Sequence, residues 1–171
     1  WLDLSLIILG LPRSRTAWLS VFMSQSNTYF HHEAINGCNS IDEYKLKVKG
    51  CGDSTTAFQF LGDAIPGQAV VIIKKTESEL RRCIEWCNLS FGGNYDAPLR
   101  EMHHQMMGLD GMVVNQSDID KKLKQIWRHL VGDDWKEMYS RIGNMNIQVK
   151  DTAADIVAAK NFIKEASPCL G

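Results

Sequence analysis

The chain has 171 residues, of which 44% are hydrophobic, and its 19 Lys and Arg residues nearly balance its 20 Asp and Glu residues, for a formal charge of -1. This length and composition predict one domain with one substantial core and leave little room for two. The balanced charge excludes a global field that would attract nucleic acid or a membrane surface, so any anion site is expected to be local.

Buried strands and helical patterns alternate along the chain. Residues 4–9 are apolar apart from Ser5 and stop at Gly10, as expected for a central parallel strand. Two further apolar runs lie at 69–73 and 112–114. Each run is followed by a helical pattern, at 16–25, 78–89 and 119–130. The alternation predicts an α/β fold with three layers, in which helices flank a central, mainly parallel β-sheet.

The segment between the first two strands, residues 27–66, is longer than one crossover helix requires, so it is interpreted as an insert. Within it we expect a short strand at 27–33 and an edge strand at 48–51. Between them, residues 40–49 are typical of a helix in which Ser40 is the N-cap and Glu43 completes a capping box.

The C-terminal part ends with an amphipathic pattern. Residues 151–166 predict a helix, and Pro168 follows it. Together these elements predict that residues 1–171 form a single domain.

The cysteines and the first residues indicate the compartment. Five cysteines is an odd number, and no paired C-x-x-C spacing occurs, which argues against a disulfide framework and against a zinc site. The opening apolar run is short and no basic segment precedes it, so it is typical of neither a signal peptide nor a membrane span. We therefore expect a cytoplasmic location and no bound metal. Since residue 1 is Trp rather than Met, the N-terminus is expected to be trimmed or incomplete.

The strongest local signal is ILGLPRSRTAWL, residues 8–19, where a buried strand breaks at Gly10 and Pro12 and passes directly into a helix. Such a break directs backbone N–H groups and the positive end of the helix dipole at one point, which favours an anion. Charge and hydroxyl donors are added by Arg13, Ser14, Arg15 and Thr16. The alternative is an ordinary turn with solvated arginines.

The residues of this loop also indicate which anion it binds. In the pattern G-x-x-x-x-G-K-[S/T] of ATP and GTP sites, the last three positions are filled here by Arg15, Thr16 and Ala17. The phosphate-binding Lys and the hydroxyl that would hold Mg²⁺ are both missing, which favours a metal-free transfer.

The loop resembles that of sulfotransferases that use 3′-phosphoadenosine 5′-phosphosulfate (PAPS), and especially the compact sulfotransferase-like P-loop proteins of bacteria and phages. Their loop has the order Pro, basic, Ser, Gly, Thr, Thr, Trp. The corresponding residues here are Pro12, Arg13, Ser14, Arg15, Thr16, Ala17 and Trp18. The resemblance implies a P-loop fold in which this loop binds the 5′-phosphosulfate and Arg13 stabilises charge on the bridging oxygen. Arg15 replaces a Gly, and its side chain is expected to require an ordinary backbone conformation.

A second motif of that family, a strand ending in Arg followed eight residues later by a helical Ser, holds the 3′-phosphate. Lys75 and Cys83 occupy these positions, and Lys74, Ser78 and Arg82 are further possible donors. Of the Arg and Ser of this motif, the chain retains only the positive charge. Lys binds phosphate as a point charge, and a thiol is a poor donor. The alternative is a strand end with solvated lysines and a structural buried cysteine.

The catalytic base is sought in YFHHEAING, which contains His31, His32 and Glu33. The resemblance places a His or Glu near the end of the second strand, and Glu33 is the best match in position. An imidazole, with an ordinary pKa of about 6.5, is also suited, but adjacent strand residues point to opposite faces, so the two histidines cannot both enter the site. Exposed loop histidines are the alternative. Asp53 and Ser54 are a second candidate pair, for which an N-cap and turn is the favoured interpretation.

Two other features are interpreted as structural. His103 and His104 would lie about 100° apart on a helix and do not converge on a metal; solvated histidines beside a core-facing methionine stripe are favoured over a lid. Trp86, Trp127 and Trp135 are expected to be core anchors.

The resemblance implies a PAPS-dependent sulfotransferase that transfers a sulfuryl group to a hydroxyl or amine of a small-molecule or glycan-type acceptor, with no nucleic acid or membrane as partner. Two alternatives remain open: a Mg²⁺-dependent P-loop nucleotide kinase or NTPase, and a non-catalytic sulfotransferase-like module that binds nucleotide. The basic loop that closes over the 3′-phosphate in full-length members is not recognised in residues 133–171.

Overall fold

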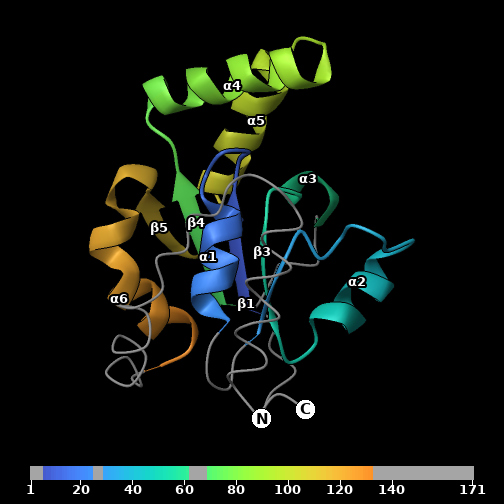
Figure 1. The fold of residues 1–171 in the computed structure, drawn as a ribbon, viewed down its shortest axis with the longest axis vertical. Coiled ribbons are helices and arrows are strands. Elements are labelled where there is room, and N and C mark those ends of the chain that lie inside the picture. Colours follow the sequence, from blue (N-terminus) through green and yellow to red (C-terminus); the bar gives the residue numbers. More distant parts are fainter. Residues whose placement is uncertain (1–5, 25–28, 62–68, 133–171) are drawn as a thin grey trace.

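The computed structural model of the protein describes residues 6–24, 29–61 and 69–132 (Figure 1). The elements in this part of the chain are β1 (Leu6–Gly10), α1 (Thr16–Met23), β2 (Phe30–His32), α2 (Ile41–Val48), β3 (Gly52–Thr55), α3 (Phe58–Leu61), β4 (Ala69–Lys74), α4 (Glu77–Phe91), α5 (Asp96–Met107), β5 (Met112–Asn115), the 3₁₀ turn η2 (Gln116–Asp118) and α6 (Ile119–Leu130).

The strands form one five-stranded sheet in the order β2-β3-β1-β4-β5. Every pairing in it is parallel, so the predicted α/β class is confirmed. β1 lies in the centre, with β3 on one side and β4 on the other. The strand order therefore reverses at β1, and in open parallel sheets the crevice at the carboxyl ends of such strands is where ligands bind.

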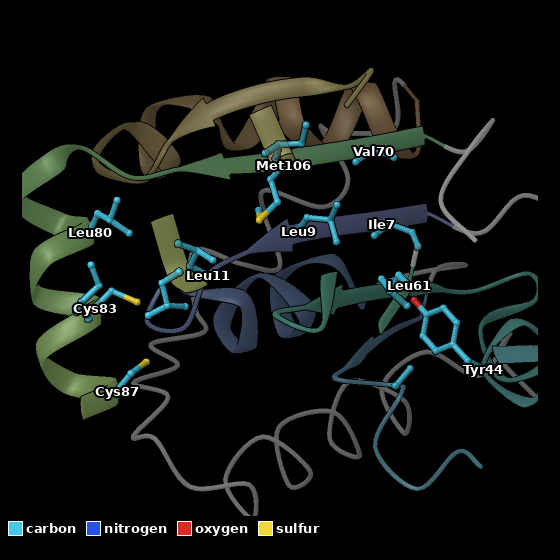
Figure 2. Packing of buried hydrophobic residues seen from close by; sticks show 14 of the residues in the cluster. Ile7, Leu9, Leu11, Tyr44, Leu61, Val70, Leu80, Cys83, Cys87 and Met106 are labelled. Atoms are coloured by element: carbon cyan, nitrogen blue, oxygen red, sulfur yellow. The ribbon is translucent and has the colours of Figure 1, made fainter. Parts of the chain in front are cut away.

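Helices cover both faces of the sheet and give the three layers that the alternation predicts. Ile7 and Leu9 of β1 pack in one cluster with residues of α2, α4 and α5, whereas Ile8 packs in a second cluster with residues of α1 and α6. Figure 2 shows Leu80 and Cys83 of α4 in the first cluster, near Leu11 at the end of β1. Since β1 contributes to both clusters, it is fully buried from Ile7 onward, which explains its continuous apolar sequence.

The element boundaries follow the sequence pattern where an apolar periodicity is strong. The predicted helix 119–130 coincides with α6. α4 begins one residue before the expected position, because Thr76 caps it and Glu79 completes a capping box. At α2, Ser40 is the N-cap as predicted and accepts a hydrogen bond from Glu43 N. The predicted capping box is wrong, since the Glu43 carboxylate accepts from the Asn39 backbone N–H at 2.6 Å instead of from Ser40.

The edge strand expected at 48–51 is wrong both in its residue range and in its place in the sheet. α2 extends through Val48, because Val48 and Tyr44, one helical turn apart, are both buried. Gly50, at φ 69°, lies in the turn after α2, and the strand that follows is β3. β3 lies between β2 and β1 rather than at the edge of the sheet.

Asp53 and Ser54, expected as an N-cap and turn, lie inside β3 and are fully buried, so that interpretation is wrong. The Asp53 carboxylate accepts hydrogen bonds from Ala34 N at 3.1 Å and from the Tyr44 hydroxyl at 3.2 Å. Burial and the neighbouring Asp53 raise the pKa of Tyr44, so its hydroxyl remains a donor. These bonds allow a carboxylate to occupy a buried strand position.

Two expectations, the helix at 151–166 and Trp135 as a core anchor, lie outside the described residues. Among the helices of the described ranges, none has both the length and the apolar character that crossing a membrane requires.

Replacing Gly52 with alanine is expected to destabilise the fold. A Cβ at this position would lie 2.4 Å from ring atoms of Phe30, whose side chain is fully buried and cannot move aside without disturbing the second cluster. Overpacking of this kind costs about 1–3 kcal/mol. Chemical denaturation should show a lower midpoint for Gly52→Ala and little change for the control Gly108→Ala, whose added Cβ meets only one backbone oxygen at 3.4 Å. Equal midpoints for the two variants would contradict this packing.

Candidate functional site

The loop between β1 and α1, residues 11–15, reverses the chain at the carboxyl end of the central strand. Arg13 and Arg15 both adopt the left-handed backbone conformation, with φ of 65° and 61°. The expectation that Arg15 needs an ordinary conformation is therefore wrong: it takes the conformation for which a Gly would be best suited.

Contacts of the Arg15 side chain offset the cost of this conformation. Its guanidinium lies 4.4 Å from the centre of the Trp18 ring and pairs with Asp120 of α6 at 2.9 Å. Arg15 is also the N-cap of α1, and its side chain makes no capping hydrogen bond to that helix. The N-terminus of α1 thus offers backbone donors and the positive end of its dipole.

Ser14 is the buried polar residue of the loop. It is fully buried, and its hydroxyl has no hydrogen-bond partner among the described residues. The absence of a side chain at Gly10 leaves room for the Ser14 side chain, because a Cβ on Gly10 would lie 2.7 Å from Ser14 Cβ. An unpaired buried hydroxyl is costly, so a polar ligand at the loop would supply a missing partner if it reaches Ser14.

Two cavities adjoin the loop. The first, here called the His32 cavity, has a volume of about 290 Å³. It is lined by loop residues, by His32 at the end of β2 and Glu33 after it, and by Trp86 and Phe91 of α4. The second, the Lys75 cavity, has a volume of about 350 Å³ and is lined by Arg13, Lys75, Glu79, Arg82, Cys83, Trp86 and Gln116. Arg13 and Trp86 line both, and the Arg13 guanidinium carbon lies 5.6 Å from the centre of the Trp86 ring. Figure 1 shows α4 passing across the carboxyl end of the sheet.

The polar wall of the His32 cavity is a connected set of side chains. His32 Nε2 lies 3.4 Å from Thr16 Oγ1 and 3.8 Å from a carboxylate oxygen of Glu33. The Glu33 carboxylate accepts from the Thr55 hydroxyl and from the Thr56 N–H, both at 2.7 Å. These two bonds hold the carboxylate in place beside the imidazole.

His31 is separated from this wall. Its ring packs edge to face against Tyr29, with 4.8 Å between ring centres, and it lines neither cavity. The alternation of side chains along β2 thus brings one of the two neighbouring histidines to the cavity, as strand geometry requires.

The Lys75 cavity carries an excess of positive charge. Lys75, at the end of β4, is only 3% exposed, and its Nζ donates to the neutral Gln116 Oε1 at 2.5 Å. Burial lowers the pKa of Lys75, and the nearby Arg13 lowers it further. Arg82 adds another cation, whereas the carboxylate of Glu79 already accepts from Thr76 N at 2.7 Å.

Cys83 anchors the loop. Its thiol donates to the Pro12 carbonyl at 3.1 Å, and burial raises the pKa of this thiol to about 12. It is therefore a neutral neighbour of the Lys75 cavity. The thiol at this position therefore has two possible roles, the hydrogen bond to the Pro12 carbonyl of the loop and a contact to a ligand.

The other predicted donors lie outside the cavities. Lys74 is exposed and lines neither cavity, and the exposed hydroxyl of Ser78 lies 3.2 Å from Thr76 Oγ1. Trp18 stacks on Phe22 at 5.4 Å and lines neither cavity, whereas Ala17 lines the His32 cavity.

His103 is half-buried rather than solvated, which corrects the expectation for this residue; His104 is exposed. His103 Nε2 accepts the Lys75 backbone N–H at 3.2 Å. Burial, with Lys74 and Lys75 nearby, lowers the pKa of His103, consistent with a neutral acceptor. The methionine stripe does face the core: Met106 is fully buried, and Met102 and Met107 pack against its cluster.

Several lining residues were not predicted from the sequence. Trp127 is buried as expected, but Trp86 is 37% exposed and lines both cavities, so its assignment to the core is wrong. Phe91, Thr56 and Gln116 were not singled out. Thr56 and Gln116 follow the ends of β3 and β5, and the rule that parallel strands present ligand-binding residues at their carboxyl ends would have indicated them.

Within residues 6–24, 29–61 and 69–132, no group of three or more His, Cys, Asp or Glu side chains is placed to hold a metal ion. No protein-family model and none of the curated proteins compared with this chain matches it.

Proposed function

We propose that the chain binds the sulfuryl donor PAPS at the β1–α1 loop and transfers its sulfuryl group to a hydroxyl acceptor in the His32 cavity. The observation that carries the proposal is the position of Arg13 in the wall shared by two cavities. One of these cavities contains a buried cation, and the other contains an imidazole and a carboxylate. Transfer from a phosphorylated nucleotide to a hydroxyl requires an anion site for the donor and a proton acceptor for the hydroxyl. The two must lie on opposite sides of one charged group, which is Arg13 here.

Two features support the donor site. The N-terminus of α1 and Arg13 suit the 5′-phosphosulfate, since both favour negative charge. Lys75 and Arg82 suit the 3′-phosphate. Lys75 is a buried cation whose side chain pairs with a neutral amide, and a dianionic phosphate would compensate this charge.

The transfer step forms one bond and breaks another. The acceptor oxygen bonds to sulfur as the bond from sulfur to the bridging oxygen breaks, and the electron pair remains on the 5′-phosphate of adenosine 3′,5′-bisphosphate. The acceptor proton passes to His32, and the product is a sulfate ester. Arg13 would stabilise the charge on the departing oxygen, as oxyanion-hole donors do.

His32 is the better base of the two candidates in the cavity. Both Glu33 oxygens accept hydrogen bonds, from Thr55 and Thr56, so Glu33 is better suited to stabilise the imidazolium from 3.8 Å. This assignment departs from the expectation that Glu33 matches the base position best.

Adenosine 3′,5′-bisphosphate is expected to raise the melting temperature of the protein in buffer containing EDTA. A ligand present at 100 times its Kd stabilises the native state by about 2.7 kcal/mol, or roughly 5–10 °C for a chain of this size. Adenosine 5′-monophosphate, which lacks the 3′-phosphate, should produce a smaller shift because the Lys75 cavity would remain without its anion.

The same assay tests the kinase alternative, and an assay of sulfuryl transfer tests the non-catalytic one. A shift with ATP and Mg²⁺ but none with the bisphosphate would contradict the proposal in favour of a nucleotide kinase or NTPase. Binding of the bisphosphate with no sulfuryl transfer to any acceptor would indicate a non-catalytic nucleotide-binding module.

A further inference from the structure

The backbone of Lys75 is held by a side chain of α5. Lys75 follows the last residue of β4 and lies beyond the residues that pair β4 with β1 and β5. Its N–H donates to His103 Nε2 at 3.2 Å. The next N–H, that of Thr76, donates to the Glu79 carboxylate at 2.7 Å. Both N–H groups at the turn from β4 to α4 thus have a side-chain acceptor, as backbone donors away from water require.

His103 lies on the buried face of α5. It follows the buried Leu99 by four residues and precedes the buried Met106 by three, so the three side chains share one face of the helix. His103 lines neither cavity. A polar ring on such a face is costly unless it makes a hydrogen bond, and the bond to the Lys75 N–H offsets this cost. The packing of α5 therefore brings an acceptor to the end of β4.

The bond to the Lys75 N–H requires a neutral imidazole, because a doubly protonated ring has two donors and no acceptor. The surroundings favour the neutral form. Burial lowers the pKa of the ring, Lys74 and Lys75 lower it further, and Glu77 acts in the opposite direction. The Glu77 carboxylate is itself paired with Arg81 and Arg100, at 2.9 Å each.

The position of the Lys75 backbone also determines where its amine lies. The residue is only 3% exposed, and its Nζ donates to Gln116 Oε1 at 2.5 Å in the wall of the Lys75 cavity. Lys75 is thus held at both ends, its backbone by His103 and its amine by Gln116. Without the backbone bond, a ligand in the cavity would have to fix the residue itself, and such ordering reduces affinity.

We propose that His103 is a positioning residue for Lys75, and that protonation of His103 weakens the binding of a phosphate group in the Lys75 cavity. The inference rests on the proposed function for the identity of that group, the 3′-phosphate of the donor. Donor binding is then strongest where His103 is neutral and Lys75 is charged.

The sign of the pH dependence separates positioning from an effect of charge alone. A protonated His103 adds a cation near the cavity, and by itself this charge would strengthen the binding of an anion. The loss of the acceptor for the Lys75 N–H acts in the opposite direction. A fall in affinity when His103 gains its proton therefore reports the hydrogen bond to the backbone.

Calorimetric titration with adenosine 3′,5′-bisphosphate between pH 4.5 and 7.5 tests the inference. Wild type and His103→Gln are expected to bind equally well at pH 7.5, because a glutamine amide oxygen can accept the same N–H. As pH falls through the pKa of His103, wild-type affinity should drop about three- to tenfold relative to this variant, which does not titrate. The ligand phosphates also gain a proton at about pH 6, and comparing two proteins with the same ligand removes this effect.

His103→Leu removes the acceptor and keeps an apolar side chain of similar bulk. It should bind the bisphosphate about three- to tenfold more weakly than wild type at pH 7.5. His104→Gln is the matched control, since His104 is the exposed neighbour on the same helix, and its affinity and pH profile should follow those of wild type. Thermal unfolding at pH 7.5 verifies that each variant is folded, and imidazole NMR signals give the pKa of His103.

Each outcome separates the two proposals. The positioning role is wrong, and the donor site stands, if the bisphosphate binds but the curves of wild type and His103→Gln are parallel. The same holds if wild-type affinity rises as His103 gains its proton, if His103 does not titrate above pH 4.5, or if His103→Leu binds like wild type at pH 7.5.

If wild type binds no bisphosphate at any pH, the proposed function fails. The contact of His103 with Lys75 is then decided by NMR alone. The Lys75 amide signal should shift as His103 titrates in wild type and stay constant in His103→Gln, and a constant signal in both proteins would overturn the positioning role as well.

Discussion

Replacing Arg13 with glycine is expected to lower the affinity for adenosine 3′,5′-bisphosphate about 10- to 100-fold and the rate of sulfuryl transfer about 100- to 1000-fold. The first effect is the loss of charged hydrogen bonds to phosphate, and the second adds the loss of a group that stabilises charge in the transition state. Glycine is chosen because Arg13 has a φ of 65°, a conformation that glycine adopts without strain. The loop path is then retained while the guanidinium is removed.

Calorimetry measures the binding effect, and transfer of labelled sulfate from PAPS to a panel of hydroxyl acceptors measures the rate. Arg81→Ala is the matched control, because Arg81 is exposed, pairs with Glu77 and lines neither cavity. Its affinity and rate should match those of the wild type. Full activity in Arg13→Gly would remove the observation on which the proposed function depends.

Replacing Lys75 with methionine is expected to stabilise the unliganded protein at pH 7 and to weaken bisphosphate binding about 10- to 100-fold. Methionine fills a similar volume without a buried charge, and removing such a charge in favour of an apolar side chain is often stabilising by about 1 kcal/mol or more. The loss of affinity follows from the loss of the charge that attracts the 3′-phosphate. A less stable Lys75→Met protein would show that the charge of Lys75 is well compensated without a ligand.

The pH dependence of this effect has a definite sign. Burial, with Arg13 nearby, lowers the pKa of Lys75 below its ordinary 10.5, although Cys83, Glu79 and Cys87 of α4 act in the opposite direction. The unfolded chain therefore binds more protons between the folded pKa and 10.5, and wild-type stability rises with pH through this window. The advantage of Lys75→Met should be fully present below the folded pKa and should shrink as pH rises toward 10.5.

Bisphosphate affinity has the opposite dependence on pH. Only the protonated amine attracts phosphate, so wild-type affinity should fall as pH rises through the folded pKa of Lys75. Lys75→Arg, which stays charged throughout, should keep its affinity over the same range. Calorimetry at several pH values between 7 and 10 compares the two proteins, and parallel curves would show that Lys75 takes no part in binding.

Strong local patterns predicted most of the elements. Residues 119–130 have an apolar face at helical spacing, and α6 occupies the same range. Gly10, Pro12 and the apolar run before them were enough to predict the break after β1. Where the pattern was weak, as in residues 48–55, the boundary between α2 and β3 depended on which side chains the core buries, and the sequence alone did not reveal it.

By itself, the sequence determined the α/β class, the sharp loop at the end of the first strand and the residues of that loop, because these depend on periodicity and on nearest neighbours along the chain. Only the tertiary structure decided that β3 is internal, that His32 rather than His31 reaches the cavity, and that Trp86 joins Arg13 between two cavities. These outcomes depend on contacts between segments far apart in the chain: Arg13 and Trp86 come from different elements, and the packing of α4 across the end of the sheet brings them together.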